Sequence, residues 1–207
     1  MKKASILGIC LIVYLYTQSQ NRPEIDIHGF FDMGWVVGPS HQNGKLDYLI
    51  SVDYNPGLRM LKRIWDKGDL AIELSYHNVH FHLHQYDEKL LPNNTLHDRE
   101  RFYVHVANLG IAHRYYFSTS MYVDFGINLD WNFRKVHMIK NPDVNGDDVK
   151  TFDRTIDYFQ PFNYDVFARI GKAKWTIHYV HRLSPLIKTS SRLPGLPPQI
   201  LGIGLRM

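Results

Sequence analysis

Three histidines alternate with other residues in the run His80-x-His82-x-His84, and imidazole nitrogen is a common ligand of zinc and copper. Residues two apart on a strand lie on the same face, about 6–7 Å from each other, so two of these imidazoles could converge on one ion. Three further histidines could complete such a site: His41, His97 and His137. The alternative is that the run only marks the polar end of a strand, and the lack of a carboxylate at fixed spacing favours it. We therefore assign no metal ligands and expect no cofactor.

A second candidate for chemistry is the pair His181 and Ser184, which supplies a base and a hydroxyl nucleophile. A catalytic histidine also needs an orienting acid, and no Asp or Glu follows Asp165 in the sequence. The local triad therefore lacks its third member. We predict that the protein is not an enzyme and assign no catalytic residues, with a lipid-modifying hydrolase as the alternative.

Carboxylates also recur in pairs six residues apart, at Asp26 and Asp32 and at Asp124 and Asp130. Two neighbouring carboxyl groups can share acid and base roles in a reaction. The same residues can instead neutralise buried arginines, because a buried charge is tolerated only when it is paired. We favour the arginine-partner interpretation, and it depends on how the strands place these residues.

The strand that carries Asp124 and Asp130 has the longest alternating pattern in the chain. From Met121 to Phe133, every odd-numbered residue is apolar, while the even-numbered residues are Tyr, Asp, Gly or Asn. Successive side chains of a strand lie on opposite faces, so one face is wholly apolar. Thirteen residues exceed an average soluble strand but suit a tilted strand that crosses a bilayer, which needs about 9–11 residues plus its interfacial ends. Residues 102–117 form its antiparallel partner.

The N-terminus has the features of a secretory signal peptide. Lys2 and Lys3 precede an apolar run over residues 6–16, and 17–19 offer small residues for cleavage. We expect a signal peptide at 1–19 and one domain at 20–207. The remaining 188 residues contain no cysteine and carry 22 Lys and Arg against 20 Asp and Glu. This balance and the export signal argue against nucleic acid as a partner.

Alternating segments separated by turn residues predict eight strands in all. They span 25–37, 45–65, 70–84, 102–117, 121–133, 158–170, 174–187 and 199–207, with a β-bulge where the apolar face of 70–84 changes parity. Residues 55–57, Asn-Pro-Gly, are expected to kink the second strand. Longer polar loops at 38–44, 85–99, 140–155 and 188–198 alternate with short turns at 66–69, 118–120 and 171–173. This is the connection pattern of outer-membrane barrels.

The face opposite the apolar one holds eight acids and six arginines. They are Asp26, Asp32, Asp47, Asp53, Glu73, Asp124, Asp130 and Asp165 with Arg59, Arg63, Arg134, Arg169, Arg182 and Arg206. An export signal, membrane-length strands and aromatic-rich apolar faces favour the arrangement with this charged face inside. We therefore predict an all-β, eight-stranded antiparallel up-and-down transmembrane β-barrel whose polar interior is filled by side chains.

The central hairpin also supports a resemblance to a known family. The run 102–133, with Arg114-Tyr115-Tyr116-Phe117, a short turn and Met121-Tyr122-Val123-Asp124-Phe125-Gly126, resembles the PorT-like outer-membrane β-barrels of Bacteroidetes-type Gram-negative bacteria. Residues 165–182 and 201–207 occupy the places of that family's last strands. The resemblance implies an integral outer-membrane protein with a structural or accessory role in an outer-membrane assembly, including type IX protein secretion.

The last 42 residues carry seven Lys or Arg and no acid. Lys188 and Arg192, in the last predicted loop, could bind lipopolysaccharide phosphates, or they could simply keep the loop soluble. We expect outer-membrane lipids, lipopolysaccharide and other outer-membrane or periplasmic complex subunits as partners. The alternative function is an outer-membrane enzyme, or a surface barrel that binds metal or lipopolysaccharide.

Overall fold

The computed structural model describes residues 23–39, 44–191 and 193–207, so the expected signal peptide lies outside the described residues. The protein is all-β, as predicted. Its strands are β1 (Ile25–Val37), β2 (Val52–Trp65), β3 (Gly68–Leu83), β4 (Arg99–Tyr116), β5 (Met121–Pro142), β6 (Asp148–Asp153), β7 (Phe162–Lys172), β8 (Trp175–Arg182) and β9 (Gln199–Arg206). A single turn of 3-10 helix, η2 (Thr189–Ser191), lies between β8 and β9. No helix in the described part of the chain is long and apolar enough to cross a membrane.

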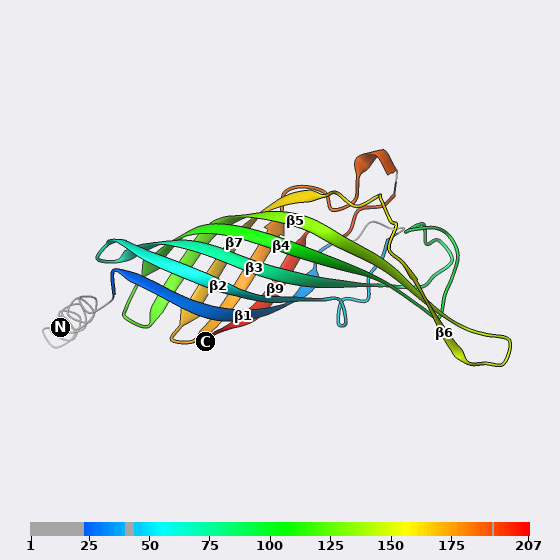
Figure 1. The fold of residues 1–207 in the computed structure, drawn as a ribbon, viewed down its shortest axis with the longest axis horizontal. Coiled ribbons are helices and arrows are strands. Elements are labelled where there is room, and N and C mark those ends of the chain that lie inside the picture. The colour runs from blue at the N-terminus through cyan, green and yellow to red at the C-terminus, as the bar shows by residue number, and fades with distance from the viewer. Residues whose placement is uncertain (1–22, 40–43, 192) are drawn as a thin grey trace, which may run out of the picture.

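Eight of these strands form a closed antiparallel ring (Figure 1). Each strand pairs with the next along the chain, with β5 followed by β7, and the pairing of β1 with β9 closes the ring. The predicted antiparallel up-and-down arrangement of eight strands is therefore confirmed. The short turns and the C-terminal end lie at one end of the ring, and the longer connections lie at the other.

The ninth strand, β6, stands outside the ring. Residues 140–155 were expected to be a loop, and this is wrong, because β5 continues to Pro142 and β6 pairs back onto it from His137 to Pro142. The five-residue connection is stabilised by Asp143, whose carboxylate accepts hydrogen bonds from the backbone N–H groups of Asn145 and Asp147. The resulting hairpin projects beyond the rest of the molecule (Figure 1).

The second strand is shorter than predicted. It begins at Val52 rather than at residue 45, and Leu46, in the part predicted as strand, is buried outside it. The expected kink at Asn55-Pro56-Gly57 does not interrupt the pairing, since all three residues remain in register with β1. Asn55 and Pro56 have no partner on β3. Proline has no N–H group to donate to a neighbouring strand, so the gap in the pairing leaves no hydrogen bond unmade at Pro56.

Exposure alternates along the strands near the short turns. On β5, Phe125, Ile127 and Leu129 are 60%, 61% and 53% exposed, while Asp124 and Asp130, which flank this run, are buried. Apolar side chains of β2, β3, β4, β7, β8 and β9 continue the exposed band around the ring: Leu58, Leu74, Leu109, Ile111, Ile170, Ile177 and Ile203. Exposed aromatic residues border it on both sides, Trp65, Tyr115, Phe117 and Trp175 near the short turns and Tyr76, Trp131, Phe133, Phe162, Tyr164 and Tyr179 opposite them. We call these two borders the lower and upper aromatic bands.

Beyond the upper aromatic band the apolar side chains face the interior of the ring instead of its outer surface. On β3 the apolar residues Val79, Phe81 and Leu83 are buried, whereas on the other side of the same strand Leu74 and Tyr76 are exposed. We predicted a β-bulge here, and this is wrong, because β3 pairs with β4 residue by residue from Gly68 to Leu83. The parity changes because the buried side of the ring changes from polar to apolar, with no extra residue in the backbone.

Register shifts occur elsewhere, between Arg63 and Trp65 at the end of β2 and on β5. Val106 pairs with Asn132 and His105 pairs with Arg134, so Phe133 has no partner of its own on β4. The extra residue reverses the phase of everything that follows it. Arg134, expected to face the interior, is therefore exposed on the outer face beside His105.

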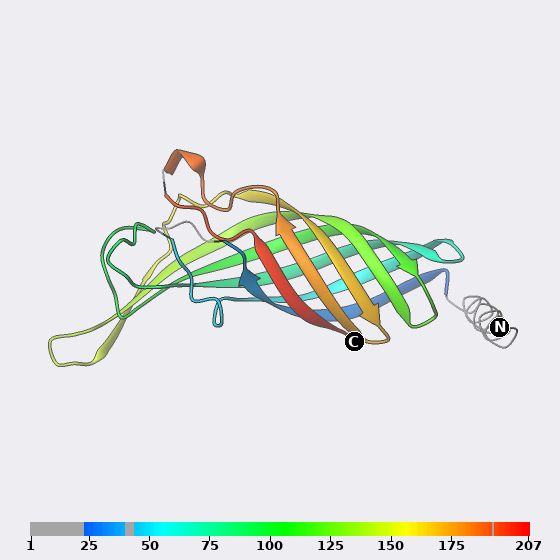
Figure 2. The same cartoon turned by 180° about the vertical axis from the view of Figure 1, so that it is seen from behind.

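The strands differ greatly in length, and a hydrophobic cluster fills the end where the long ones extend. β3, β4 and β5 have 16, 18 and 22 residues, whereas β8 and β9 have eight each (Figures 1 and 2). Loop residues pack against the inner face of the long strands, and the buried members of the cluster include Val79, Phe81, Leu83, Leu91, Phe102, Val104, Val106, Phe159, Leu186, Ile187 and Leu196. The interior was expected to be polar throughout, and this end of it is apolar.

Candidate functional site

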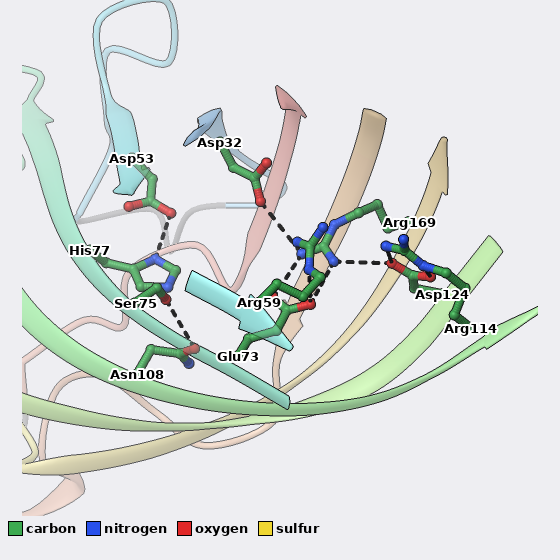
Figure 3. A network of polar contacts seen from close by, with 10 residues as sticks. All are labelled: Asp32, Asp53, Arg59, Glu73, Ser75, His77, Asn108, Arg114, Asp124 and Arg169. Atoms are coloured by element: carbon green, nitrogen blue, oxygen red, sulfur yellow. Dashed lines mark hydrogen bonds and ion pairs between the residues drawn. The ribbon is translucent and has the colours of Figure 1, made fainter. Parts of the chain in front are cut away.

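The most connected group of functional side chains is a buried network inside the ring, between the two aromatic bands. Six strands contribute one residue each, three arginines and three acids. They are Asp32 (β1), Arg59 (β2), Glu73 (β3), Arg114 (β4), Asp124 (β5) and Arg169 (β7), all exposed by 5% or less. Figure 3 shows the side chains converging on one another across the interior. We call these six residues the interior ion network.

Arg169 links three acids in this network. Its Nη1 lies 2.8 Å from Oε1 of Glu73 and 3.2 Å from Oδ2 of Asp124, and its Nη2 lies 3.5 Å from Oδ2 of Asp32. Glu73 also accepts a 2.7 Å hydrogen bond from Nε of Arg59. Three positive and three negative charges are thus matched within hydrogen-bonding distance, the condition under which buried charges are tolerated.

Arg114 completes the network, and it was missed in the sequence. It donates two hydrogen bonds to Asp124, from Nε at 2.7 Å and from Nη2 at 2.8 Å, and its guanidinium lies 3.6 Å from the ring centre of Tyr122. Residues of β4 in the same phase, such as Val104 and Val106, are apolar, so they gave no sign that this phase faces a charged interior. The signal available was Asp124, which pairs with Arg114 in the register of a hairpin with a short turn.

A second polar group lies next to this network on the side of the hydrophobic cluster. Nδ1 of His77 is 2.9 Å from Oδ2 of Asp53, and Asn108 donates a 2.6 Å hydrogen bond to Asp130. A cavity between this group and the hydrophobic cluster has a volume of only about 10 Å³. That is about the space of one water molecule. Side chains therefore fill the interior at this level, and a substrate could not occupy it.

The loop after β3 is anchored by a third buried group, the loop latch of Lys89, Glu100 and His137. Lys89 reaches inward to the Glu100 carboxylate, which also accepts hydrogen bonds from His137 Nε2 at 2.7 Å and from Gln85 at 3.1 Å. Burial alone would raise the pKa of Glu100, but the hydrogen bonds from His137, Lys89 and Gln85 outweigh it and hold that pKa below its ordinary value. The latch keeps residues 85–98 folded against the mouth of the barrel. It was not predicted.

The histidines considered as metal ligands do not come together. His84 is 2.8 Å from Asp47, His80 lies between the rings of Tyr54 and Tyr103, and His137 belongs to the loop latch inside the ring. His97 contacts Asn141. His41 lies outside the described residues. Within residues 23–39, 44–191 and 193–207, no three His, Cys, Asp or Glu side chains form a group that could hold a metal ion.

The other predicted candidates have structural contacts. The Ser184 hydroxyl is bonded by the Asn163 amide and by the backbone N–H of Tyr164, both at 2.9 Å, while His181 lies beside Tyr179. These bonds tie the loop after β8 to the start of β7, which gives Ser184 a structural role.

The two carboxylates of each pair have separate partners. Three of the four residues contact an arginine, as the arginine-partner interpretation predicted, and the fourth, Asp130, contacts an asparagine. Asp26 accepts a 2.7 Å hydrogen bond from Arg206 near the short-turn end, Asp32 and Asp124 belong to the interior ion network, and Asp130 is bonded by Asn108. Of the other residues expected inside, Asp53, Asp165 and Arg182 are buried. Asp47 and Arg63 are only partly buried. Arg192 lies outside the described residues, and Lys188 is partly buried near Lys135.

Among the strands that the structure describes, β6 of the projecting hairpin is the most exposed. Every residue of β6 is exposed, and among them are the apolar side chains of Val149 and Phe152. Val144 at the tip is fully exposed. β6 pairs only with β5 among the described strands, so its other edge presents unpaired backbone groups.

Models of known protein families do not match this sequence, and no characterised protein matches it either.

Proposed function

We propose that the chain is an integral outer-membrane β-barrel of a Gram-negative envelope, with a structural or accessory role in an outer-membrane assembly. The observation that carries this proposal is the band of exposed apolar side chains around the ring, bordered by the two aromatic bands. On β5 the band extends from Met121 to Phe133, about 40 Å along the strand, or about 28 Å in height at a tilt of roughly 45°. A bilayer has a hydrocarbon core about 30 Å thick.

The interior supports a structural role rather than transport. Six charged side chains from six strands meet inside the ring, and the loop latch and the hydrophobic cluster close the far end. Water and solutes would have to break matched ion pairs to pass. An eight-stranded barrel has room in its interior for little besides its own side chains.

The hairpin β5–β6 supports an accessory role, because it presents what a partner protein can bind. It reaches beyond the mouth of the barrel with an open strand edge and exposed apolar side chains. A strand from a partner can add to such an edge through backbone hydrogen bonds. The resemblance of residues 102–133 to PorT-like barrels points in the same direction, and we propose that the assembly is one of protein secretion of the type IX kind.

A pull-down from the native envelope in mild detergent tests this function. We expect the wild-type barrel to co-purify with a fixed set of outer-membrane or periplasmic proteins. A variant in which residues 139–151 are replaced by a two-residue Asn-Gly turn, which joins the paired residues Met138 and Phe152, keeps the ring, so it should insert normally and lose those proteins. Heat-modifiable migration in detergent gels checks that both barrels are folded. Purification of the wild type as a lone barrel would contradict the accessory role.

A further inference from the structure

The outer face of the ring changes character immediately above the upper aromatic band on β3, β4 and β5. The register places side chains of these strands in rows across the sheet, and successive rows are two residues apart. The row of Tyr76, Ala107 and Trp131 still belongs to the band. The three rows above it contain five basic side chains, which we call the outer basic strip: His80, His82, Arg101, His105 and Arg134.

No carboxylate balances this strip within its rows. The other described residues in these rows on β2 to β6 are Val52, Tyr54, Asn78, Tyr103, Val136, Met138 and Phe152. Acids occur at the upper rim, where Asp47, Asp98 and Glu100 line a groove of about 540 Å³ together with His82 and Arg101. Glu100 is already bound by Lys89 and His137 in the loop latch. Asp47 is already in contact with His84. The strip therefore has an excess of positive charge.

Two polar atoms of the strip are buried and have no protein partner. Nε of Arg101 and Nε2 of His80 are hidden from solvent, and neither atom forms a hydrogen bond with any residue that the structure describes. A buried donor without an acceptor is costly, by about 1–3 kcal/mol. Burial and the neighbouring Arg101 lower the pKa of His82 to about 4, so Arg101 and Arg134 supply the charge at neutral pH. An anion at this place would satisfy the Arg101 donor that the protein leaves open.

The height of the strip selects the kind of anion. The hydrocarbon core of a bilayer is about 30 Å thick and the whole bilayer about 40–45 Å, which leaves about 5–8 Å for the headgroups of each leaflet. Each row adds about 6–7 Å along a strand, or about 5 Å in height at the tilt of a barrel strand. The first two rows of the strip, with His105, Arg134 and His80, therefore lie at headgroup height directly above an apolar wall.

We propose that the outer basic strip binds the phosphate groups of a phosphorylated glycolipid in the outer leaflet. This inference rests on the proposed location in the outer membrane. Arginine forms paired, charge-assisted hydrogen bonds to phosphate. The lipid source is favoured over free phosphate because the band of Leu74, Leu109 and Leu129 below the strip provides a surface for acyl chains.

Binding of purified lipid A to the refolded barrel in zwitterionic detergent micelles tests the proposal, with native mass spectrometry as the readout. The probes are bis-phosphorylated lipid A and the same lipid after removal of both phosphates. The test variant is Arg101→Gln/Arg134→Gln. The matched control, Lys62→Gln/Lys172→Gln, removes two exposed positive charges at the short-turn end.

We expect the wild type and the control to bind the phosphorylated lipid alike, and the test variant to bind it at least about tenfold more weakly. Dephosphorylated lipid should bind all three proteins equally weakly. Equal binding of the phosphorylated lipid by the test variant and the wild type overturns the proposal, and so does equal binding of the two lipids by the wild type. If the protein instead fails to enter micelles and shows no heat-modifiable migration, the proposed location fails too, and the two failures are thus distinguished.

Discussion

Arg169 on β7 and Glu73 on β3 form an ion pair, with 2.8 Å between Nη1 and Oε1, although β4 and β5 lie between their strands around the ring. The pair therefore spans the interior instead of following the sheet. Because Glu73 also contacts Arg59 on β2, one carboxylate holds two guanidinium groups. Backbone pairing fixes each strand only to its neighbours, whereas this contact fixes opposite walls of the barrel.

Replacing Glu73 by Ala should destabilise the barrel by about 3–5 kcal/mol, because Arg59 and Arg169 would lose the carboxylate they share. Urea unfolding in detergent micelles, followed by heat-modifiable migration, measures the change. Glu88 in the exposed loop is the control, and Glu88→Ala should stay within about 0.5 kcal/mol of the wild type. A Glu73→Ala barrel as stable as the control would show that the network does not hold the walls together.

Replacing Leu129 by Arg tests the membrane directly. Leu129 is 53% exposed in the middle of the apolar band, so a charge there would face hydrocarbon and cost about 2–4 kcal/mol. In a water-soluble barrel the same exposed substitution would be nearly neutral. Unfolding in lipid vesicles gives the free energy, and Val149→Arg on the projecting hairpin is the control that should cost little. A neutral Leu129→Arg would rule out a bilayer around this band.

The loop latch makes stability depend on acid pH. Hydrogen bonds hold the pKa of Glu100 below its ordinary value, so its stabilising contribution is complete above about pH 4.3 and is lost as the pH falls below that towards the lowered pKa. Glu100→Gln should cost about 1.5–3 kcal/mol at pH 7, and the difference from the wild type should shrink at lower pH. Unfolding monitored by circular dichroism at pH 7 and pH 3 measures both. A difference that stays constant with pH would contradict the role of the latch.

The filled interior predicts that the protein forms no ion channel. Purified barrel added to a planar bilayer should produce no conductance steps above background, whereas a porin added to the same bilayer gives an open aqueous channel. Steady single-channel steps that disappear on proteolysis of the protein would show that the ion network opens in the membrane.

The sequence was most informative where one environment persists along a strand. β1 has the predicted bounds, 25–37, because the same face of it stays buried from His28 to Val36 while the other face is apolar throughout. β3 and β5 cross from one environment to another, and the same alternation then has two explanations. On β3 the apolar residues change face although no residue is inserted, whereas on β5 a residue is inserted although the sequence pattern does not reveal it. Only the residue-by-residue pairing with the neighbouring strand distinguishes the two cases.

The candidate sites followed the same rule. The acids of the interior ion network stood out because each lies between two apolar residues, on the face opposite the apolar one. Lys89 gave no such signal, since it lies in a polar loop and is buried only because that loop folds back onto Glu100. His80 and His82 share a face of β3 as predicted, but His80 lies between two tyrosine rings while His84 contacts Asp47, so the imidazoles do not converge on one point.

The pairing of β1 with β9 joins the first and last strands across eight residue pairs, compared with eighteen between β4 and β5. Until β9 is in place, the edge of β1 that does not pair with β2 has no partner strand, so the sheet cannot close. Closure takes place at the shorter of these two seams, and a chain without residues 199–206 would retain two open edges, on β1 and β8, that invite aggregation. A holding factor that shields β1 until β9 arrives would meet this kinetic need.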